Sequence, residues 1–298
     1  MQWYQVKEQA VGKKRLMLLW YIYNLFGKKA VNFIAFFVTF FAFIFAKDVR
    51  GYSKKYLTVI NPLTGIKPNL INQFKHFLSY THVLTDKIEI YPNKFDKNKI
   101  IFESEDAKEE LYSDLDKGKG VFFLCAHAGN TDVMRTLFIN NTRHPDLKVN
   151  VFLSQNQCKI FNGFVKKIAK EIPLTPYPVE EIGVDTAIRL KDSLEDGSIA
   201  FIAADRVPEN TDTATFEAEI FGHKADFPVG SFKLAQLMEV PIYFIIALKD
   251  KNDTYKIYLQ HYEYTTIKDL QAAYIKFVED IVLKSPLQFY HFYDFFKD

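Results

Sequence analysis

The sequence of 298 residues is poor in cysteine: it contains only Cys125 and Cys158. Two isolated cysteines provide neither a disulfide framework nor metal-ligand spacing, which fits a reducing compartment. The chain also lacks a strong excess of one charge, because 38 Lys and Arg residues face 36 Asp and Glu residues, for a net charge of +2. Such a balance gives no indication of nucleic-acid binding. Internal repeats and low-complexity linkers are absent as well.

Aromatic residues are what the chain has in abundance. Phe, Tyr and Trp make up 16% of it, and 29 residues are Phe. Such a chain can build a large core, but it can also expose apolar surface to lipid. Its length suffices for one large α/β domain or two small ones.

The first 56 residues differ in character from the rest. Residues 16–26 are apolar, Lys28 and Lys29 interrupt, and residues 30–46 are again apolar except for Asn32 and Thr39. The second run is at the short edge of what a spanning helix needs, and basic residues flank it on both sides. We expect a membrane-embedded or interfacial anchor over residues 1–56, with a buried core helix as the alternative. The start is too late, and the flanks too basic, for a typical signal peptide.

Residues 57–298 are predicted to form the second unit. Residues 57–119 are mostly helical in pattern, with breaks at 61–62 and 92–93. Apolar spacing predicts a helix over 69–84, an acidic solvated helix over 103–116, and short strands at 88–91 and 100–102.

From Gly120 onward, strand-like and helix-like segments alternate. The strand-like runs are 121–126, 149–153, 199–203, 241–248 and 255–261. Helix-like runs between and after them cover 132–139, 158–170, 181–194, 231–239 and 267–284. This alternation predicts an α/β fold: a mixed, mainly parallel sheet covered by helices and preceded by the N-terminal membrane-associating helix.

The first candidate site follows the apolar run from Gly120 to Ala126. His127 ends this run, and Asp132 lies five residues later in an H-x-x-x-x-D pattern. Gly129 allows a turn and Asn130 is a suitable N-cap, so Asp132 is expected in the first turn of the next helix. The two side chains can then converge as an imidazole base oriented by a carboxylate. The alternative is a buried histidine near an ordinary helix start.

The second candidate is the strand that ends at Asp205 and Arg206. Both residues are expected at the same carboxyl edge of the sheet as His127, where α/β proteins bind ligands. Arg206 can hold a phosphate or an anionic head group with its planar fork, whereas the alternative is a surface ion pair of little energetic value.

The third candidate is the loop that leads into the helix near Ser231. Pro228 and Gly230 indicate a tight turn, and the backbone N–H groups at this helix start can face an anion or a developing oxyanion. A plain strand–loop–helix connection is the alternative.

Cys125 lies inside an apolar strand and is expected to be a packed thiol rather than a nucleophile. His127 and His223 lack a third ligand at a supporting spacing, so no metal is expected.

In this order, the pieces resemble the lysophospholipid acyltransferase superfamily, and within it the bacterial lipid A biosynthesis (lauroyl/myristoyl) acyltransferases. The matching pieces are an apolar N-terminal helix, His127 to Asp132, Asp205-Arg206, residues 220–230, the Pro-led strand at 241 and the Pro-x-Gln-aromatic segment at 286–290. Thr131 stands where the lipid A enzymes usually carry Trp, and Phe and Tyr replace Trp in the C-terminal segment. These departures leave the acceptor open.

The resemblance implies a membrane-associated acyltransferase without a resident cofactor. His127 would take the proton of an acceptor hydroxyl or amine, and Asp132 would orient His127. Substrate binding would fall to five further residues: Asn130, Asp205, Arg206, Gly230 and Ser231. The implied partners are an acyl-carrier-protein or CoA thioester as donor, a membrane lipid or glycolipid as acceptor, and the membrane surface. The implied location is the bacterial inner membrane, with the site facing the cytoplasm. A lipid-binding protein without turnover, and a hydrolase on the same fold, are the competing interpretations.

Overall fold

A computed structural model describes residues 13–139, 141–159, 163, 174–207, 213–250 and 252–297. Its α-helices are α1 (Lys13–Phe45), α2 (Lys47–Thr64), α3 (Leu70–Ile90), α4 (Glu105–Asp116), α5 (Thr131–Thr136), α7 (Val184–Glu195), α8 (Val229–Met238) and α9 (Ile267–Val282). Its strands are β1 (Ile100–Phe102), β2 (Val121–Gly129), β3 (Val149–Leu153), β4 (Leu174–Pro178), β5 (Ile199–Ala203), β6 (Thr215–Ile220), β7 (His223–Pro228), β8 (Ile242–Lys249) and β9 (Tyr255–His261). Short 3₁₀ turns lie at Lys97–Lys99, Val179–Glu181 and, as η4, at Pro286–Gln288.

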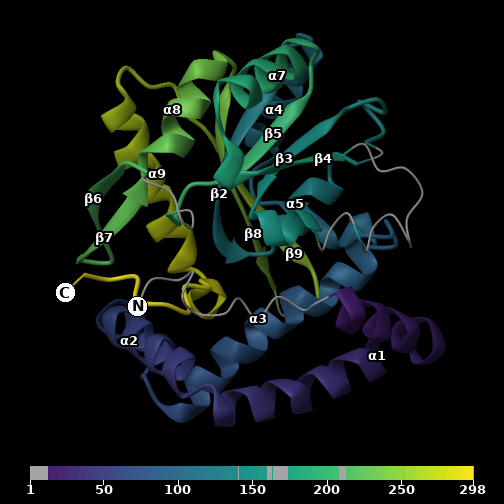
Figure 1. The fold of residues 1–298 in the computed structure, drawn as a ribbon, viewed down its shortest axis with the longest axis vertical. Helices are drawn as coiled ribbons and strands as arrows, with labels where there is room; N and C mark the ends of the chain where they lie inside the picture. Colours follow the sequence, from purple (N-terminus) through teal and green to yellow (C-terminus); the bar gives the residue numbers. More distant parts are fainter. Residues whose placement is uncertain are drawn as a thin grey trace.

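A seven-stranded sheet with the order β1-β9-β8-β2-β5-β3-β4 forms the centre of the molecule (Figure 1). All neighbours run parallel except β8 and β9, which form an antiparallel pair. The prediction of an α/β fold with a mixed, mainly parallel sheet is therefore confirmed. β2 lies between β5 and β8, so the carboxyl ends of β2 and β5 meet at one edge.

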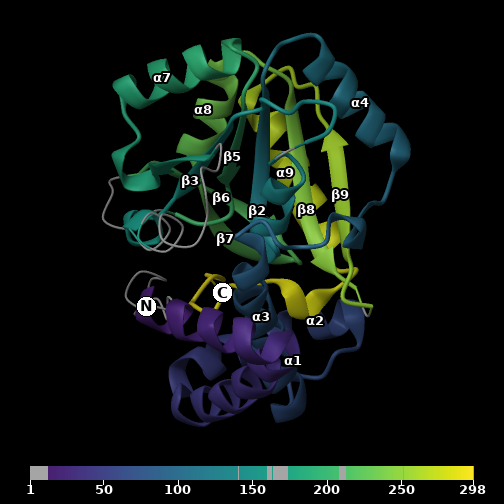
Figure 2. The same ribbon diagram turned by 90° about the vertical axis from the view of Figure 1, so that its right-hand side faces the viewer.

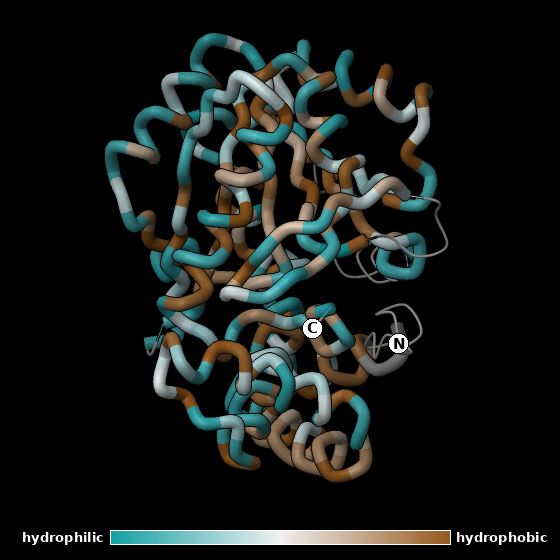
Figure 3. Tube along the Cα trace, turned by 90° about the vertical axis from the view of Figure 1, so that its left-hand side faces the viewer, coloured by the Kyte–Doolittle hydropathy of each residue, from teal (hydrophilic) through white to brown (hydrophobic). Residues whose placement is uncertain are grey.

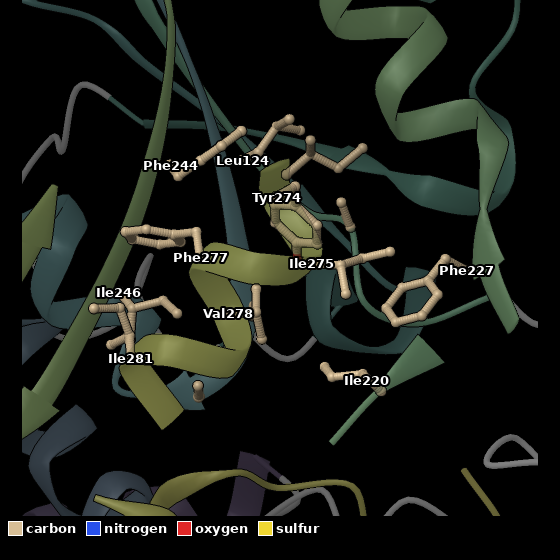
Figure 4. Close-up of a cluster of buried hydrophobic side chains, with 14 of the residues drawn as sticks. Leu124, Ile220, Phe227, Phe244, Ile246, Tyr274, Ile275, Phe277, Val278 and Ile281 are labelled. Atoms are coloured by element: carbon tan, nitrogen blue, oxygen red, sulfur yellow. The ribbon is translucent and has the colours of Figure 1, made fainter. Parts of the chain in front are cut away.

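Each face of the sheet buries its own core, because successive side chains of a strand point to opposite faces. Phe122 and Leu124 of β2 point to the face that α7, α8 and α9 cover, whereas Val121 and Phe123 point to the face of α4 and α5. Figure 4 shows the first face, where α9 presents Tyr274, Phe277, Val278 and Ile281 to side chains of β2 and β8. Burial on both faces explains why these strands read as continuous apolar runs rather than as alternating ones.

The first three helices form a layer at one end of the sheet, beneath its carboxyl edge (Figures 1 and 2). α1 packs along α3, with the rings of Phe36, Phe40 and Phe43 in edge contact with Phe74. Its other side stays exposed: Phe33, for example, keeps 66% of its surface. Figure 3 shows hydrophobic and hydrophilic stretches side by side in this layer. The alternative of a buried core helix over 30–46 is therefore wrong.

In the described part of the chain, α1 is the one helix whose length and hydropathy suffice to cross a membrane, over Leu16–Phe45. It is kinked at Gly27, next to the interrupting lysines, where φ is 76°. A helix of this composition near an N-terminus occurs both in membrane anchors and in signal sequences.

Several boundaries differ from the sequence prediction. Residues 88–91 were expected as a strand, but α3 continues to Ile90 because Ile88 and Ile90 pack as helical residues in the core. The break expected at 61–62 is wrong too, since α2 contains Pro62 and ends before Gly65, which takes the left-handed conformation. The boundary expected between residues 56 and 57 falls inside α2. The helix expected over 158–170 lies largely outside the described residues.

Candidate active site

The site begins at the end of β2, where the strand is irregular. Pairing with β8 shifts register between Cys125 and Gly129, which indicates a bulge around His127. Gly129 has φ of 62°, and a Cβ at this position would lie 1.9 Å from the carbonyl oxygen of Ala247. Only glycine lets the chain turn this closely against β8.

The turn leads directly into α5, as the sequence predicted. Asn130 is the N-cap, and its side-chain oxygen accepts the backbone N–H groups of Asp132 and Val133. Its amide donates to the hydroxyl of Tyr255 at 3.0 Å. Asn130 is fully buried and does not line the cavity described below, so its role here is capping rather than the predicted substrate binding.

Asp205, and not Asp132, is the carboxylate that orients His127. The Nδ1 atom of His127 lies 2.8 Å from Asp205 Oδ1, and the backbone N–H of His127 donates to Asp205 Oδ2 at 2.7 Å. Burial favours the protonated acid, but the contacts with His127 and His291 outweigh it and hold the pKa of Asp205 well below its usual range. Because an ionised carboxylate only accepts hydrogen bonds, His127 carries its proton on Nδ1, and in the neutral ring Nε2 holds the lone pair.

A second histidine contacts the same carboxylate. His291 Nε2 lies 2.8 Å from Asp205 Oδ2. The chain after η4 brings it there, because Phe289 bridges to Ala128 and the N–H of Tyr290 donates to the carbonyl of His127 at 2.9 Å. Asp205 is thus fully buried behind His127, which corrects its predicted role in substrate binding.

Asp132 has partners of its own. Its carboxylate pairs with Lys87 of α3 at 3.1 Å and with Arg135, one turn further along α5, and it also accepts a hydrogen bond from Tyr91. Burial would raise the pKa of Asp132, but Arg135 and Lys87 lower it below its ordinary value. Burial would likewise lower the pKa of Lys87, and the Asp132 carboxylate raises it instead. The predicted orienting contact between Asp132 and His127 is therefore replaced by an ionic cluster beside it.

A cavity of about 430 Å³ joins these groups. Its charged and polar lining comes from His127, Asp132, Lys87, Arg135, Glu180 and Arg206. Its apolar lining includes Val83, Leu84, Phe152, Ile182 and Ile202. The side chain of His127 is 37% exposed, so its ring is accessible while the carboxylate of Asp205 is not. A cavity lined by both charged and apolar side chains fits an amphiphilic ligand.

The first turn of α8 borders the same cavity through Gly230 and Ser231, as predicted. Pro228 is the N-cap and provides no side-chain cap, while the N–H of Val229 donates to Ala214. The next N–H groups belong to the first helical turn, which has no intrahelical acceptor for them. Together with the helix dipole, they favour negative charge at this end.

Arg206 lines the cavity as predicted, and its position is fixed by the C-terminal segment. Its guanidinium donates to the carbonyl of Tyr290 and lies 5.6 Å from the centre of the Tyr293 ring.

Cys125 is packed within β2, as expected, and burial raises the pKa of its thiol to about 12. Among the described residues, no three His, Cys, Asp or Glu side chains are arranged to bind a metal ion.

Three residues of the site were not predicted from the sequence: Lys87, Arg135 and His291. Arg135 follows Asp132 by three residues on one helix, a spacing that brings side chains together, so it was open to prediction. Lys87 reaches the site only because α3 packs there, and His291 lies one residue beyond the Pro-x-Gln-aromatic segment without a signal of its own.

No protein-family model matches the chain, and no curated protein matches it either.

Proposed function

We propose that the protein is a membrane-associated acyltransferase that moves a fatty acyl chain from a thioester to a hydroxyl or amine of a lipid or glycolipid. The observation that carries this proposal is the His127–Asp205 pair, which lies against a cavity that is lined by charged and apolar side chains and by the N-terminus of α8. The order of motifs that resembles the lipid A acyltransferases supports the same reaction.

The reaction follows from the position of each group. His127 Nε2 takes the proton of the acceptor hydroxyl as its oxygen attacks the thioester carbonyl, and Asp205 stabilises the imidazolium. The carbonyl oxygen becomes an oxyanion, which the N–H groups of Gly230 and Ser231 are suited to stabilise. When the tetrahedral intermediate collapses, the C–S bond breaks and the thiolate takes the proton from His127. No covalent acyl-enzyme is required.

The charged and the apolar lining suit different parts of the substrates. Lys87 and Arg135 together carry one more charge than Asp132 neutralises, and Arg206 and Glu180 add one charge of each sign, so the lining keeps an excess of positive charge. The cations suit a phosphate on the acceptor or on the donor, either acyl carrier protein or CoA. The apolar side chains suit the acyl chain.

Membrane association follows from α1. One of its sides packs on α3 and the other exposes phenylalanines, so we propose that it lies in the interfacial plane with α3 above it. The proposed location is the bacterial inner membrane, with the cavity facing the cytoplasm, where acyl thioesters are made.

The test is transfer of a labelled acyl group by the purified wild type and His127→Ala, from acyl-carrier-protein and CoA thioesters to lipid extracts. Loss of the base is expected to lower the rate by about 10²–10⁴-fold without changing vesicle binding. Full transfer by His127→Ala would refute the base. Free fatty acid as the main wild-type product would favour the hydrolase, and lipid binding without thioester consumption would favour the non-catalytic protein.

A further inference from the structure

The proposed acyl transfer steps do not use His291, which is buried beside Asp205. His291 is 2% exposed, and its ring packs against those of Phe289 and Phe295, with centroid distances of 4.1 and 4.2 Å. Its Nε2 contacts Asp205 Oδ2, the same oxygen that accepts the backbone N–H of His127. Apolar packing alone does not require an imidazole at this position.

The partners of His291 determine where its proton lies. Asp205 is ionised and only accepts, so His291 Nε2 must donate to it. Burial lowers the pKa of His291 to about 3 although Asp205 acts in the opposite direction, so the ring is neutral and its Nδ1 accepts a hydrogen bond. The hydroxyl of Tyr293 lies 2.8 Å from Nδ1 and donates to it. A directed chain of donors thus runs from Tyr293 through His291 to Asp205.

We propose that His291 is a positioning residue whose Nε2–H holds Asp205 in the orientation that receives His127 Nδ1–H and takes up part of the carboxylate's charge. The proposal rests on the proposed function, since it concerns the basicity of the same base. A carboxylate that shares its charge with a neutral donor stabilises an imidazolium less than a carboxylate without that donor. His291 therefore holds the base in place and also limits its affinity for protons.

Other charged groups around the two rings stay the same when His291 alone is changed. The cavity wall presents Lys87, Asp132, Arg135, Glu180 and Arg206 to the His127 side. Tyr80, Tyr91 and Tyr290 border the cavity as well. On the His291 side, the titratable and charged neighbours are Asp205, Arg206, His127 and Tyr293. A change in titration of His127 in a His291 variant is then assigned to the lost donor.

Two substitutions separate the hydrogen bond from the packing. His291→Phe keeps a ring in contact with Phe289 and Phe295 but removes the donor. His291→Gln retains an N–H donor near the position of Nε2 but removes the ring. A positioning role predicts that the glutamine variant resembles the wild type and the phenylalanine variant does not, whereas a packing role predicts the reverse.

The kinetic test measures acyl transfer across pH for the three proteins. For His291→Phe we expect kcat to fall about 10-fold with KM unchanged, because an outer hydrogen-bond partner of a catalytic group is lost. The acid limb of kcat/KM should move to higher pH by about half a unit to one unit, since His127 then faces the full charge of Asp205. His291→Gln should restore most of both values.

A second readout needs no turnover, and so separates this proposal from the assignment of acyl transfer. In protein labelled with ¹⁵N-histidine, the titration midpoint of His127 should rise in His291→Phe and not in His291→Gln. An unchanged midpoint in His291→Phe, or equal changes in both variants, would overturn the proposal. If His291→Phe fails a thermal-melting control, Tyr293→Phe replaces it. That variant removes the hydroxyl that donates to Nδ1 and keeps the ring. It should shift the His127 midpoint in the same direction by a smaller amount, and no shift would overturn the proposal.

Discussion

Asp205 and Asp132 are both buried carboxylates near the candidate base, and their partners give them different roles. Asp205 accepts from the ring and the backbone of His127 and from His291. Asp132 pairs with Lys87 and Arg135, which line the cavity with it. The first orients the ring of His127, whereas the second holds two cations in place at the cavity.

At the scale of single residues, amide substitutions should separate these roles. Asp205→Asn leaves His127 without its acceptor and should lower kcat by about 10³–10⁴-fold with little change in KM, as for other histidine bases that lose their carboxylate. Asp132→Asn leaves Lys87 and Arg135 without the carboxylate that neutralises them. It should raise KM and destabilise the fold by about 3 kcal/mol. Steady-state kinetics and urea unfolding measure both. Asp226→Asn, in a surface pair with Lys297, is the matched control. A pure kcat loss in Asp132→Asn, as large as that in Asp205→Asn, would contradict this division.

The sequence predicts the residues of the site better than it predicts their partners. His127 and Arg206 were identified because parallel strands end at one edge of a sheet, which is a property of the fold. The choice of Asp132 as orienting carboxylate relied on closeness in sequence, whereas the partner that His127 has lies 78 residues away. Which of two nearby carboxylates faces a ring depends on side-chain packing that the spacing does not contain.

At the scale of elements, the bulge at the end of β2 determines where His127 lies. Gly129→Ala combines the left-handed φ with a Cβ 1.9 Å from Ala247 O, and should destabilise the protein by more than about 3 kcal/mol or prevent folding. Gly222→Ala is the control, because φ is 76° there and nothing lies within 4 Å of a Cβ. It should cost about 1 kcal/mol. Urea unfolding followed by circular dichroism compares them, and equal costs would show that the close approach to β8 is unimportant.

Elements with a single dominant pattern were predicted well. β3 and β5 match their predicted ranges because buried parallel strands form largely apolar runs. β9 also matches its predicted range, although Lys256 and Gln260 interrupt its apolar residues. The hairpin of β6 and β7 was not predicted: β6 alternates exposed and half-buried residues, and its antiparallel pairing depends on the turn at Phe221 and Gly222. α3 continues beyond residue 84, where the predicted helix ends, to Ile90. Tertiary contacts of Ile88 and Ile90 there outweigh the β-propensity of these residues.

At the scale of the whole molecule, the exposed phenylalanines of α1 gather at one end and α7 lies at the other (Figure 1). Replacing Phe33, Phe37 and Phe41 with Ser should reduce partition into lipid vesicles by at least about 100-fold. Each Phe side chain that moves from water into lipid contributes about 1.5–3 kcal/mol to the free energy of partition. Val184→Ser with Ile188→Ser on α7 is the control and should leave partition unchanged, although both side chains are also exposed. Vesicle flotation measures the outcome. Unchanged partition of the α1 variant would argue that α1 is not the membrane-binding surface.

The C-terminal segment that reaches back to β2 also sets an order of events during synthesis. α1 precedes every described strand in the chain, whereas Phe289, Tyr290 and His291 follow all of them. At about 5–20 residues per second, the interval between the synthesis of α1 and that of these three residues is on the order of ten seconds to a minute. A nascent chain can therefore expose α1 to a membrane surface well before His127 is oriented. The proposed acyl transfer is then withheld until residues 289–291 have been made.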